Sequence, residues 1–205
     1  MSYTLLRVSE FGVVLWEGHC ERLGIVPEID TRLHATLHRE LLARGAGVYA
    51  VRVDGGAFTI ESRQDRRWPQ AIAWSTALSP LFGGTGLRAK ADVLSLYADL
   101  RTRTGEVLCT DGSGDYVYET ARASVFAWDG ARVIAPPIDA PRVSSVGELA
   151  LRDAYTVSCR PLRVDGDTGA LFVLNAVRGP GRLQGHDLPE HVFDAINEAF
   201  ALLEA

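Results

Sequence analysis

The sequence predicts an α+β fold, in which mostly antiparallel strands form sheets and helices pack on them. Three observations indicate this class. Short apolar segments with strand character recur along the chain, tight turns rich in glycine and aspartate join several of them, and a few segments with helical periodicity lie between the strands. No internal repeat is visible. The 205 residues are enough for one large domain or two small ones around a buried core.

The first part of the chain is expected to alternate strands with helices. Residues 19–23 (HCERL) predict one helical turn, and a leucine repeat predicts a helix over residues 31–43 with Asp30 as its N-cap. The sequence Asp54-Gly55-Gly56 indicates a hairpin turn. The residues expected on the apolar stripe of the helix are Leu33, Leu37, Leu41 and Leu42. The strands expected in this part cover residues 3–8, 13–16, 48–53, 57–63 and 71–75, the first two around a turn at residues 10–12.

A Gly/Pro-rich stretch at residues 79–86 interrupts this pattern and is the expected connection between two domains. We therefore expect a small N-terminal α/β subdomain over residues 1–82 and a larger C-terminal subdomain over residues 83–205. The helices expected beyond the connection cover residues 90–104, 149–154 and 190–203, the last burying Val192, Phe193, Ile196, Phe200 and Leu203. The strands expected there cover residues 106–110, 116–118, 121–128, 131–135, 156–164 and 170–174.

Charge and composition exclude several classes of partner. The net charge is −5 and the arginines are scattered, so no basic stripe for nucleic acid is visible. No apolar run approaches the about 20 residues that a membrane helix needs, and the N-terminus lacks the pattern of a secretory signal. The three cysteines are widely spaced and are expected to be free thiols, with no metal site. We therefore expect a cytoplasmic protein that acts on a small molecule, without a nucleic-acid or membrane partner.

Lysine is nearly absent from the chain. Of the 21 lysines and arginines, only Lys90 is a lysine. Arginine can replace lysine where a solvated charge is enough, but not where an amine must react, because a guanidinium stays protonated and is a poor nucleophile. Lys90 also opens a predicted helix directly after the glycine-rich connection, at a domain junction where clefts form. Lys90 is therefore a candidate for amine chemistry, and chance survival of one lysine is the alternative.

Four motifs follow one another in an order that resembles the class IV aminotransferase family, the fold type IV pyridoxal-phosphate enzymes. The motifs are HCERL at residues 19–23, Lys90 with Tyr97 seven residues later, YETARASVF at residues 118–126 with a WDG turn, and LFVLNAVRG at residues 171–179. The last motif and the short N-terminus are similar to aminodeoxychorismate lyase-like members. The resemblance covers residues 3–185, which is nearly the whole chain.

The resemblance implies a fold type IV enzyme with pyridoxal 5′-phosphate (PLP) between two subdomains. Lys90 would be the catalytic residue and would carry the cofactor as a Schiff base. Glu119 would keep the pyridine nitrogen protonated, which makes the ring an electron sink. Tyr97 would pack or hydrogen-bond beside the cofactor.

The resemblance also implies the residues around the cofactor phosphate. Arg22, the arginine of HCERL, would contact the phosphate through its guanidinium. Backbone amides at a helix start would complete the phosphate site. The residues implied to contribute these amides, or to line the phosphate or substrate side, are Ser145, Val146, Gly147, Asn175 and Ala176.

The implied reaction is β-elimination from 4-amino-4-deoxychorismate, which releases pyruvate and leaves 4-aminobenzoate for folate synthesis. A small amino-acid aminotransferase is the alternative enzyme, and the family implies a homodimer. The chain departs from the family at Ser124, where an asparagine is usual, at Leu94, where an arginine is usual, and in the phosphate loop at residues 140–152. These departures favour a further alternative, a non-catalytic homologue that keeps the fold as a partner or binding module.

Overall fold

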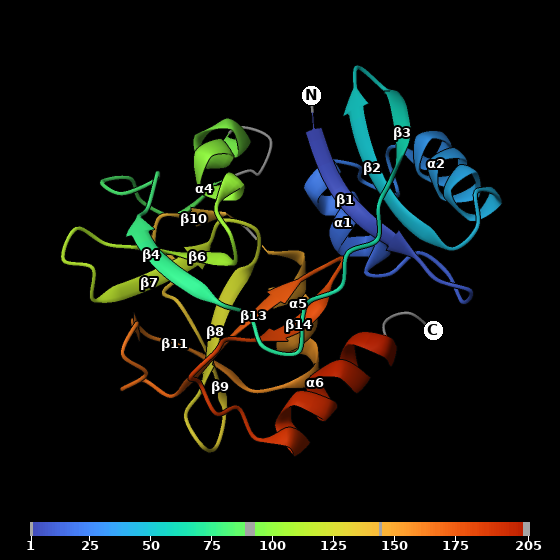
Figure 1. Cartoon of the computed structure of the whole chain (residues 1–205). Coiled ribbons are helices and arrows are strands. Elements are labelled where there is room, and N and C mark those ends of the chain that lie inside the picture. The colour runs from blue at the N-terminus through green and yellow to red at the C-terminus, as the bar shows by residue number, and fades with distance from the viewer. Residues whose placement is uncertain (1, 89–92, 144, 203–205) are drawn as a thin grey trace.

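The computed structural model describes residues 2–88, 93–143 and 145–202. Its N-terminal part is a three-stranded antiparallel sheet in the order β1-β2-β3, accompanied by two helices (Figure 1). Gly55 and Gly56 have φ values of 55° and 81°, and the register pairs Asp54 with Ala57. A two-residue turn with both residues left-handed suits glycine, so the predicted hairpin is confirmed. The elements of this part are β1 (Ser2–Val8), α1 (Trp16–Leu23), α2 (Thr31–Ala43), β2 (Gly47–Asp54) and β3 (Ala57–Arg63).

Helix α2 has the predicted bounds, and Asp30 is its N-cap residue as predicted, but the prediction that Leu42 lies on the buried stripe is wrong. Leu37 and Leu41 are fully buried, whereas Leu42 is 43% exposed, because adjacent residues of a helix point about 100° apart. Asp30 makes no side-chain cap to the helix and instead accepts a hydrogen bond from the Val26 amide at 3.0 Å. Its carboxylate therefore closes the loop before α2.

The predicted strand at residues 13–16 is also wrong. Only Val13 makes a bridge, to Val8, and Leu15 has a left-handed φ of 54° that reverses the chain into α1 at Trp16. The helical turn expected at residues 19–23 is the second half of α1.

Most of the other strands form two larger sheets, ordered β12-β7-β6-β4 and β11-β9-β8-β13-β14, and β10 and β5 form a parallel pair. Only β4–β6 and β11–β9 are parallel within the two larger sheets, so among the described residues the fold is mainly antiparallel. The predicted α+β class is confirmed. These strands are β4 (Trp74–Leu78), β5 (Leu87–Arg88), β6 (Glu106–Thr110), β7 (Tyr116–Thr120), β8 (Ser124–Trp128), β9 (Val133–Ala135), β10 (Arg142–Val143), β11 (Val157–Cys159), β12 (Leu162–Arg163), β13 (Ala170–Asn175) and β14 (Gly179–Arg182).

The five-stranded sheet is buried on both faces. Phe126 and Phe172 stack with their ring centroids 5.6 Å apart in the cluster that includes residues of α5 and α6. Val125 and Val173 belong to the cluster that joins this sheet to the four-stranded one. Because successive side chains of a strand point to opposite faces, β8 and β13 are apolar on both sides. The helices of this part are the 3₁₀ helix η1 (Leu94–Tyr97), α4 (Ala98–Thr102), α5 (Val146–Ala154) and α6 (Glu190–Leu202).

Three further predictions for this part need correction. The strand expected at residues 156–164 is divided between β11 and β12, which lie in different sheets. Strand β14, which is missing from the predicted strands, pairs with β13. Gly181 of β14 allows this close packing, because a Cβ atom there would lie 2.5 Å from Ile72 Cδ1. Helix α5 starts at Val146, three residues before the predicted start.

The predicted helices at the two ends of this part are described only in part. The helix expected over residues 90–104 consists, where described, of η1 and α4, and Lys90 lies outside the described residues. In α6, Val192, Ile196 and Phe200 are buried as predicted and Phe193 is partly buried, whereas Leu203 lies outside the described residues. No helix in the described parts of the chain is long and apolar enough to cross a membrane.

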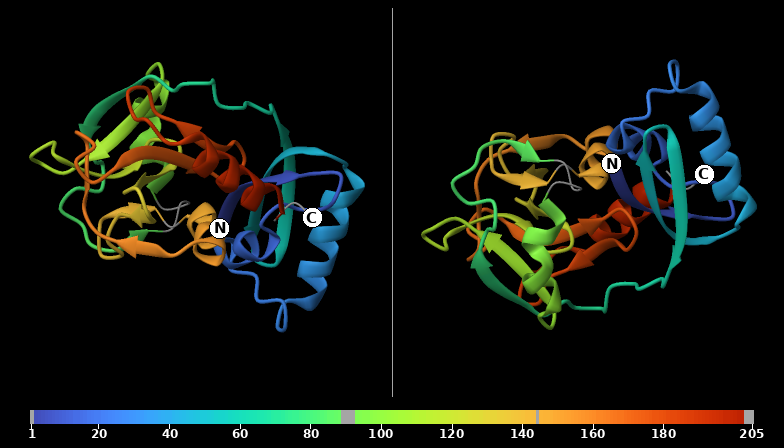
Figure 2. Two further views of the ribbon diagram at one scale, coloured as in Figure 1. Left: turned by 90° about the horizontal axis from the view of Figure 1, so that it is seen from below. Right: turned by 90° about the horizontal axis from the view of Figure 1, so that it is seen from above.

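Residues 64–73 run from the N-terminal part to the larger one along the outside of the molecule (Figure 2). Strand β4 follows them and pairs with β6, so strand pairing groups residues 74–78 with the larger part. The division of the chain into domains after residue 82 stays a prediction.

Candidate functional site

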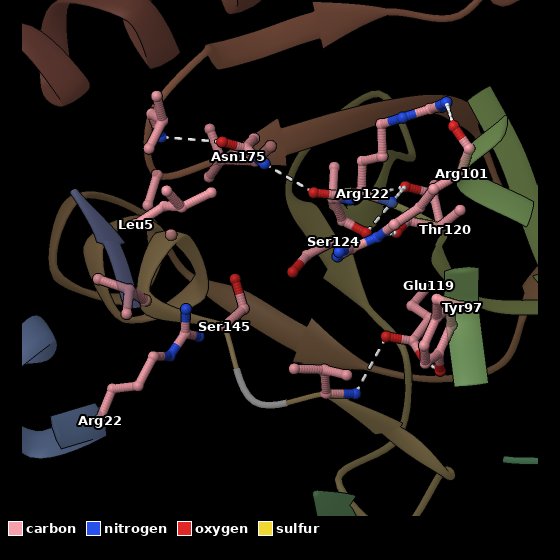
Figure 3. Close-up of a pocket in the computed structure, with 18 of the residues that line it drawn as sticks. Leu5, Arg22, Tyr97, Arg101, Glu119, Thr120, Arg122, Ser124, Ser145 and Asn175 are labelled. Carbon is pink, nitrogen blue, oxygen red and sulfur yellow. Dashed lines mark hydrogen bonds between the residues drawn. The ribbon is translucent and has the colours of Figure 1, made fainter. Parts of the chain in front are cut away.

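A pocket lies between the N-terminal part and the larger one (Figure 3). Leu5 of β1 and Arg22 of α1 contribute to its wall from the N-terminal part, and η1, α4, strand ends and the start of α5 contribute from the larger part. Within the described parts of the chain, every predicted site residue lines this pocket. These residues are Arg22, Tyr97, Glu119, Ser145, Val146, Gly147, Asn175 and Ala176. The remaining predicted residue, Lys90, lies outside the described residues.

Glu119 is a buried carboxylate near the end of β7, with 5% of its surface exposed. The Tyr97 hydroxyl donates a hydrogen bond to its Oε1 atom, and the Val143 amide donates one to Oε2 at 3.0 Å. Burial raises the pKa of Glu119 to about 7, although the two hydrogen bonds act in the opposite direction. Glu119 is therefore an oriented carboxyl group that can exchange its proton near neutral pH.

Tyr97 reaches Glu119 from η1 and is 3% exposed. Burial raises the pKa of its hydroxyl, and the adjacent Glu119 carboxylate raises it further. The hydroxyl therefore stays protonated and acts as a donor that orients Glu119.

One end of the pocket is formed by α5 and Arg22 (Figure 3). Ser145 is the N-cap of α5 and accepts a hydrogen bond from the Glu148 amide at 3.1 Å. Arg22 comes from the last turn of α1, and burial lowers its pKa to about 10, so it stays charged at neutral pH. The first amides of a helix have no partner within it and carry a partial positive charge. This end of the pocket therefore suits an anion.

A buried ion pair holds the start of α5 in place. Arg142 of β10 contacts both carboxylate oxygens of Glu148, at 2.5 and 3.2 Å, and both residues are buried. Arg152 adds a partly exposed contact to Glu148 at 2.7 Å. A Cβ atom on Gly147 would lie 2.9 Å from Leu174 Cδ2, so glycine allows the first turn to pack against β13.

Asn175 lines the pocket, and its side chain bonds to the protein backbone. Its Nδ2 donates to the Arg122 carbonyl at 2.6 Å, and its Oδ1 accepts from the Val177 and Arg178 amides at 2.9 and 3.2 Å. These bonds join the end of β13 to the loop between β7 and β8. In this arrangement Asn175 shapes the wall of the pocket, and Ala176 lies directly beside it.

Two arginines of the pocket were not predicted from the sequence. Arg122 donates to the carbonyls of Arg101, Gly105 and Arg103 and lies 3.5 Å from the buried carboxylate of Glu106. Arg101 lies four residues after Tyr97, and this spacing, which places helical side chains on one face, was the signal that could have identified it. No local signal reveals Arg122, because the partners it contacts lie far from it in the sequence.

The charge of the pocket is positive among its described residues. Arg22, Arg101 and Arg122 line it, and Glu119 is the acid among the described lining residues. Neither in the pocket nor in the other described parts of the chain do three or more histidine, cysteine or acidic side chains form a group that could hold a metal ion. The pocket therefore suits a ligand with anionic groups and a hydrogen-bond donor facing Glu119.

No protein-family model matches the chain, and no curated protein matches its sequence. Solved structures do match. A PLP-bound hypothetical aminotransferase from Mycobacterium tuberculosis gives a TM-score of 0.65 at 20% identity, covering 98% of this chain and 89% of that one. The 4-amino-4-deoxychorismate lyase from Pseudomonas aeruginosa gives 0.68 at 18% identity, covering 96% and 88%. A PLP-bound aminotransferase from Brucella abortus gives 0.67 at 14% identity, covering 98% and 88%.

These likenesses extend over nearly the whole chain and show its fold. The chain has the fold of these aminotransferases and of this lyase, so the fold that the sequence motifs implied is confirmed.

Proposed function

We propose that this chain is a PLP-dependent enzyme that eliminates pyruvate from 4-amino-4-deoxychorismate and leaves 4-aminobenzoate for folate synthesis. The main support for this proposal is the composition of the pocket. Every predicted site residue in the described parts of the chain lines it, although these residues come from α1, η1, β7, α5 and the end of β13. Solved structures with the same fold include PLP-bound aminotransferases and a 4-amino-4-deoxychorismate lyase.

The donors at the α5 end of the pocket fit the phosphate group of PLP. Arg22 presents a charged guanidinium, and Ser145, Val146 and Gly147 bring the positive end of the α5 dipole to the same place. Both kinds of donor favour a dianion. We propose that Arg22 and the first amides of α5 hold the phosphate.

PLP, when bound, supplies an electron sink for the reacting carbon of the substrate. Glu119 suits the ring nitrogen, because its buried carboxylate is oriented by Tyr97 and by the Val143 amide. When ionised, this carboxylate would stabilise a proton on the ring nitrogen, because an adjacent opposite charge favours the charged form of each group. We propose that Glu119 keeps the proton on this nitrogen and that Tyr97 keeps Glu119 in position.

Lys90 supplies the amine in this proposal. A desolvated lysine amine can act as a nucleophile and can carry a proton near neutral pH. The described residues on both sides of it flank the pocket: β5 ends at Arg88 and pairs with β10, whose Val143 lines the pocket, and Val93 lines it as well. This supports a role for Lys90 in binding the cofactor covalently and in moving the proton of the reaction.

The test uses the purified chain mixed with PLP. We expect a yellow protein whose visible band disappears on borohydride reduction. Because Lys90 is the only lysine, the reduced cofactor should be found by mass spectrometry on the peptide that contains it. Lys90→Arg keeps the positive charge but has no reactive amine, so it should lose both the band and the adduct. A colourless wild-type protein that does not retain PLP would contradict the proposal.

The reaction is tested on the same protein. Release of pyruvate and 4-aminobenzoate from 4-amino-4-deoxychorismate is expected for the lyase. Formation of an oxo acid from amino acids, without pyruvate release, would favour a small amino-acid aminotransferase. The aminotransferases from M. tuberculosis and B. abortus, which share the fold, are the observation that favours this second candidate.

A non-catalytic homologue is the third candidate. Ser124 lines the pocket where the family usually has asparagine, and the loop at residues 140–152 departs from the family pattern. Failure to bind PLP would favour this candidate. By the same likeness to the family we propose a homodimer in the cytoplasm. Light scattering during gel filtration tests the dimer, and fractionation of the source cells tests the location.

A further inference from the structure

Arg101 of α4 places a cation in the pocket. The two terminal nitrogens of its guanidinium have no role in the site as described so far. Arg101 is partly buried, and its Nε donates to the Ala121 carbonyl at 2.9 Å. Figure 3 shows its side chain extending into the pocket toward Ser124. Among the described residues, its terminal nitrogens make no hydrogen bond, and it makes no ion pair within 4.0 Å.

The neighbouring charges do not neutralise Arg101. The buried carboxylate of Glu106 already contacts Arg122, through the Arg122 amide at 3.0 Å and through the guanidinium at 3.5 Å. Glu119 is occupied by Tyr97 and by a backbone amide. Burial lowers the pKa of Arg101 and outweighs Tyr3 and Glu106, which raise it, while the nearby Arg122 cation lowers it further. A cation in these surroundings is stabilised when an anion binds next to it.

A purely structural role does not account for the whole side chain. The bond to Ala121 holds the loop between β7 and β8 and uses Nε alone. The two remaining nitrogens form the planar fork that suits a carboxylate.

The anion that meets Arg101 differs from the one that meets Arg22. In Figure 3, Arg22 and Ser145 lie at one end of the pocket, whereas Arg101 enters from the side of the loop between β7 and β8, with its tip near Ser124. A cofactor phosphate held at the α5 end leaves Arg101 for a second anionic group.

We infer that Arg101 binds a carboxylate of the amino substrate and so makes the pocket selective for amines that carry one. This inference rests on the proposed function, because it takes the α5 end as the phosphate site. The Ser124 hydroxyl lies on the same side of the pocket and is a second donor for this carboxylate. Arg101 is thereby a specificity-determining residue.

The test compares two probes of similar size, 4-aminobenzoate, which carries an anionic carboxylate, and 4-aminobenzamide, which carries a neutral amide in its place. Their affinities are measured by calorimetry for the wild-type protein, with and without PLP. We expect the carboxylate to bind at least about 10-fold more tightly than the amide, as a hydrogen bond to a charged group predicts. Arg101→Gln should weaken binding of 4-aminobenzoate about 10- to 100-fold and leave 4-aminobenzamide unchanged.

Two further variants complete the design. Arg101→Lys keeps the charge without the fork and should retain part of the preference for the carboxylate. Arg103→Gln removes an exposed charge two residues away and should bind both probes as the wild type does. The PLP band and the midpoint of thermal unfolding of Arg101→Gln show whether the pocket is intact.

The outcomes separate this inference from the proposed function. A wild-type protein that binds PLP but does not distinguish the two probes would overturn the inference alone. The same conclusion follows if Arg101→Gln folds, binds PLP and keeps the wild-type preference. A wild-type protein without PLP affinity would overturn the proposed function, and the phosphate assignment on which the inference rests would fail with it.

Discussion

At the scale of single residues, Glu119 shows how burial and hydrogen bonding compete at one carboxyl group. Its two hydrogen bonds stabilise the charged form, and burial destabilises that form more strongly, so the pKa rises to about 7. An exposed glutamate has a pKa of about 4.3. Glu119 therefore holds its proton more tightly in the folded chain than in the unfolded one.

This difference predicts a pH dependence of stability for the cofactor-free protein. The contribution of Glu119 is fully present below about pH 4 and is lost as the pH rises through about 7, because the folded-state pKa is the higher one. Glu119→Gln does not titrate. From pH 5 to pH 8, the free energy of unfolding of the wild type should fall by about 2–3 kcal/mol relative to that of Glu119→Gln.

Urea unfolding followed by circular dichroism at the two pH values measures this difference. The control Glu28→Gln removes a carboxylate from the exposed surface and is expected to follow the wild type. If the free energies of unfolding of the wild type and of Glu119→Gln change equally between pH 5 and pH 8, burial does not raise the pKa of Glu119.

At the scale of elements, helix α5 illustrates how a short helix is held in position. Its N-cap Ser145 satisfies one amide, and the pair of Arg142 and Glu148 joins its first turn to β10. The pair is buried, so each charge depends on the other. The orientation of α5, and with it the proposed phosphate site, therefore depends on this ion pair.

Removing one partner of this pair should be costly. Arg142→Ala leaves the Glu148 carboxylate buried with only its partly exposed contact to Arg152, and we expect a loss of about 3–5 kcal/mol in the free energy of unfolding, together with weaker PLP binding. Arg152→Ala removes the partly exposed partner and should cost at most about 1 kcal/mol. Thermal or urea unfolding and a PLP titration measure both effects.

A double variant keeps this prediction testable if Arg142→Ala does not fold. Replacing both partners, as Arg142→Met with Glu148→Met, removes the buried charges together and should restore much of the stability. Equal losses for Arg142→Ala and Arg152→Ala would refute the view that the buried contact is the important one.

At the scale of the whole molecule, Arg7 connects the N-terminal part to the larger one. Its guanidinium is buried and donates twice to the Val177 carbonyl, at 2.9 and 2.7 Å, and it pairs with both oxygens of Asp65, at 2.9 and 2.6 Å. Val177 lines the pocket. Arg7 therefore fixes one wall of the pocket against β1.

Arg7→Ala is expected to lower the free energy of unfolding by about 3 kcal/mol, because it leaves a buried carbonyl without its donor and Asp65 with only its contact to Arg67 at 3.8 Å. It should also weaken PLP binding, which a spectral titration measures. The matched control is Arg52→Ala on the neighbouring strand, whose pair with Glu61 is exposed and should contribute at most about 1 kcal/mol. Similar effects of the two substitutions would argue against a connecting role for Arg7.

Local sequence patterns were sufficient for some elements. The bounds of α2, the β2–β3 hairpin and the buried face of α6 follow from leucine spacing, from Gly55 and Gly56, and from helical periodicity, all of which act between residues close in the chain. The motifs around Arg22, Glu119 and Asn175, through their resemblance to a known family, likewise implied residues that line one pocket.

Other features depend on partners that no local pattern specifies. Residues 156–164 divide between two sheets because β11 pairs with β9 and β12 pairs with β7, and both of these strands lie much earlier in the chain. Arg7 bonds to a carbonyl 170 residues away. The lone lysine and the ordered motifs thus pointed to amine chemistry and to the residues that would perform it. The raised pKa of Glu119, the Arg142–Glu148 ion pair at α5 and the position of Arg101 in the pocket arise only in the folded chain, because folding brings distant charges together and removes water from them.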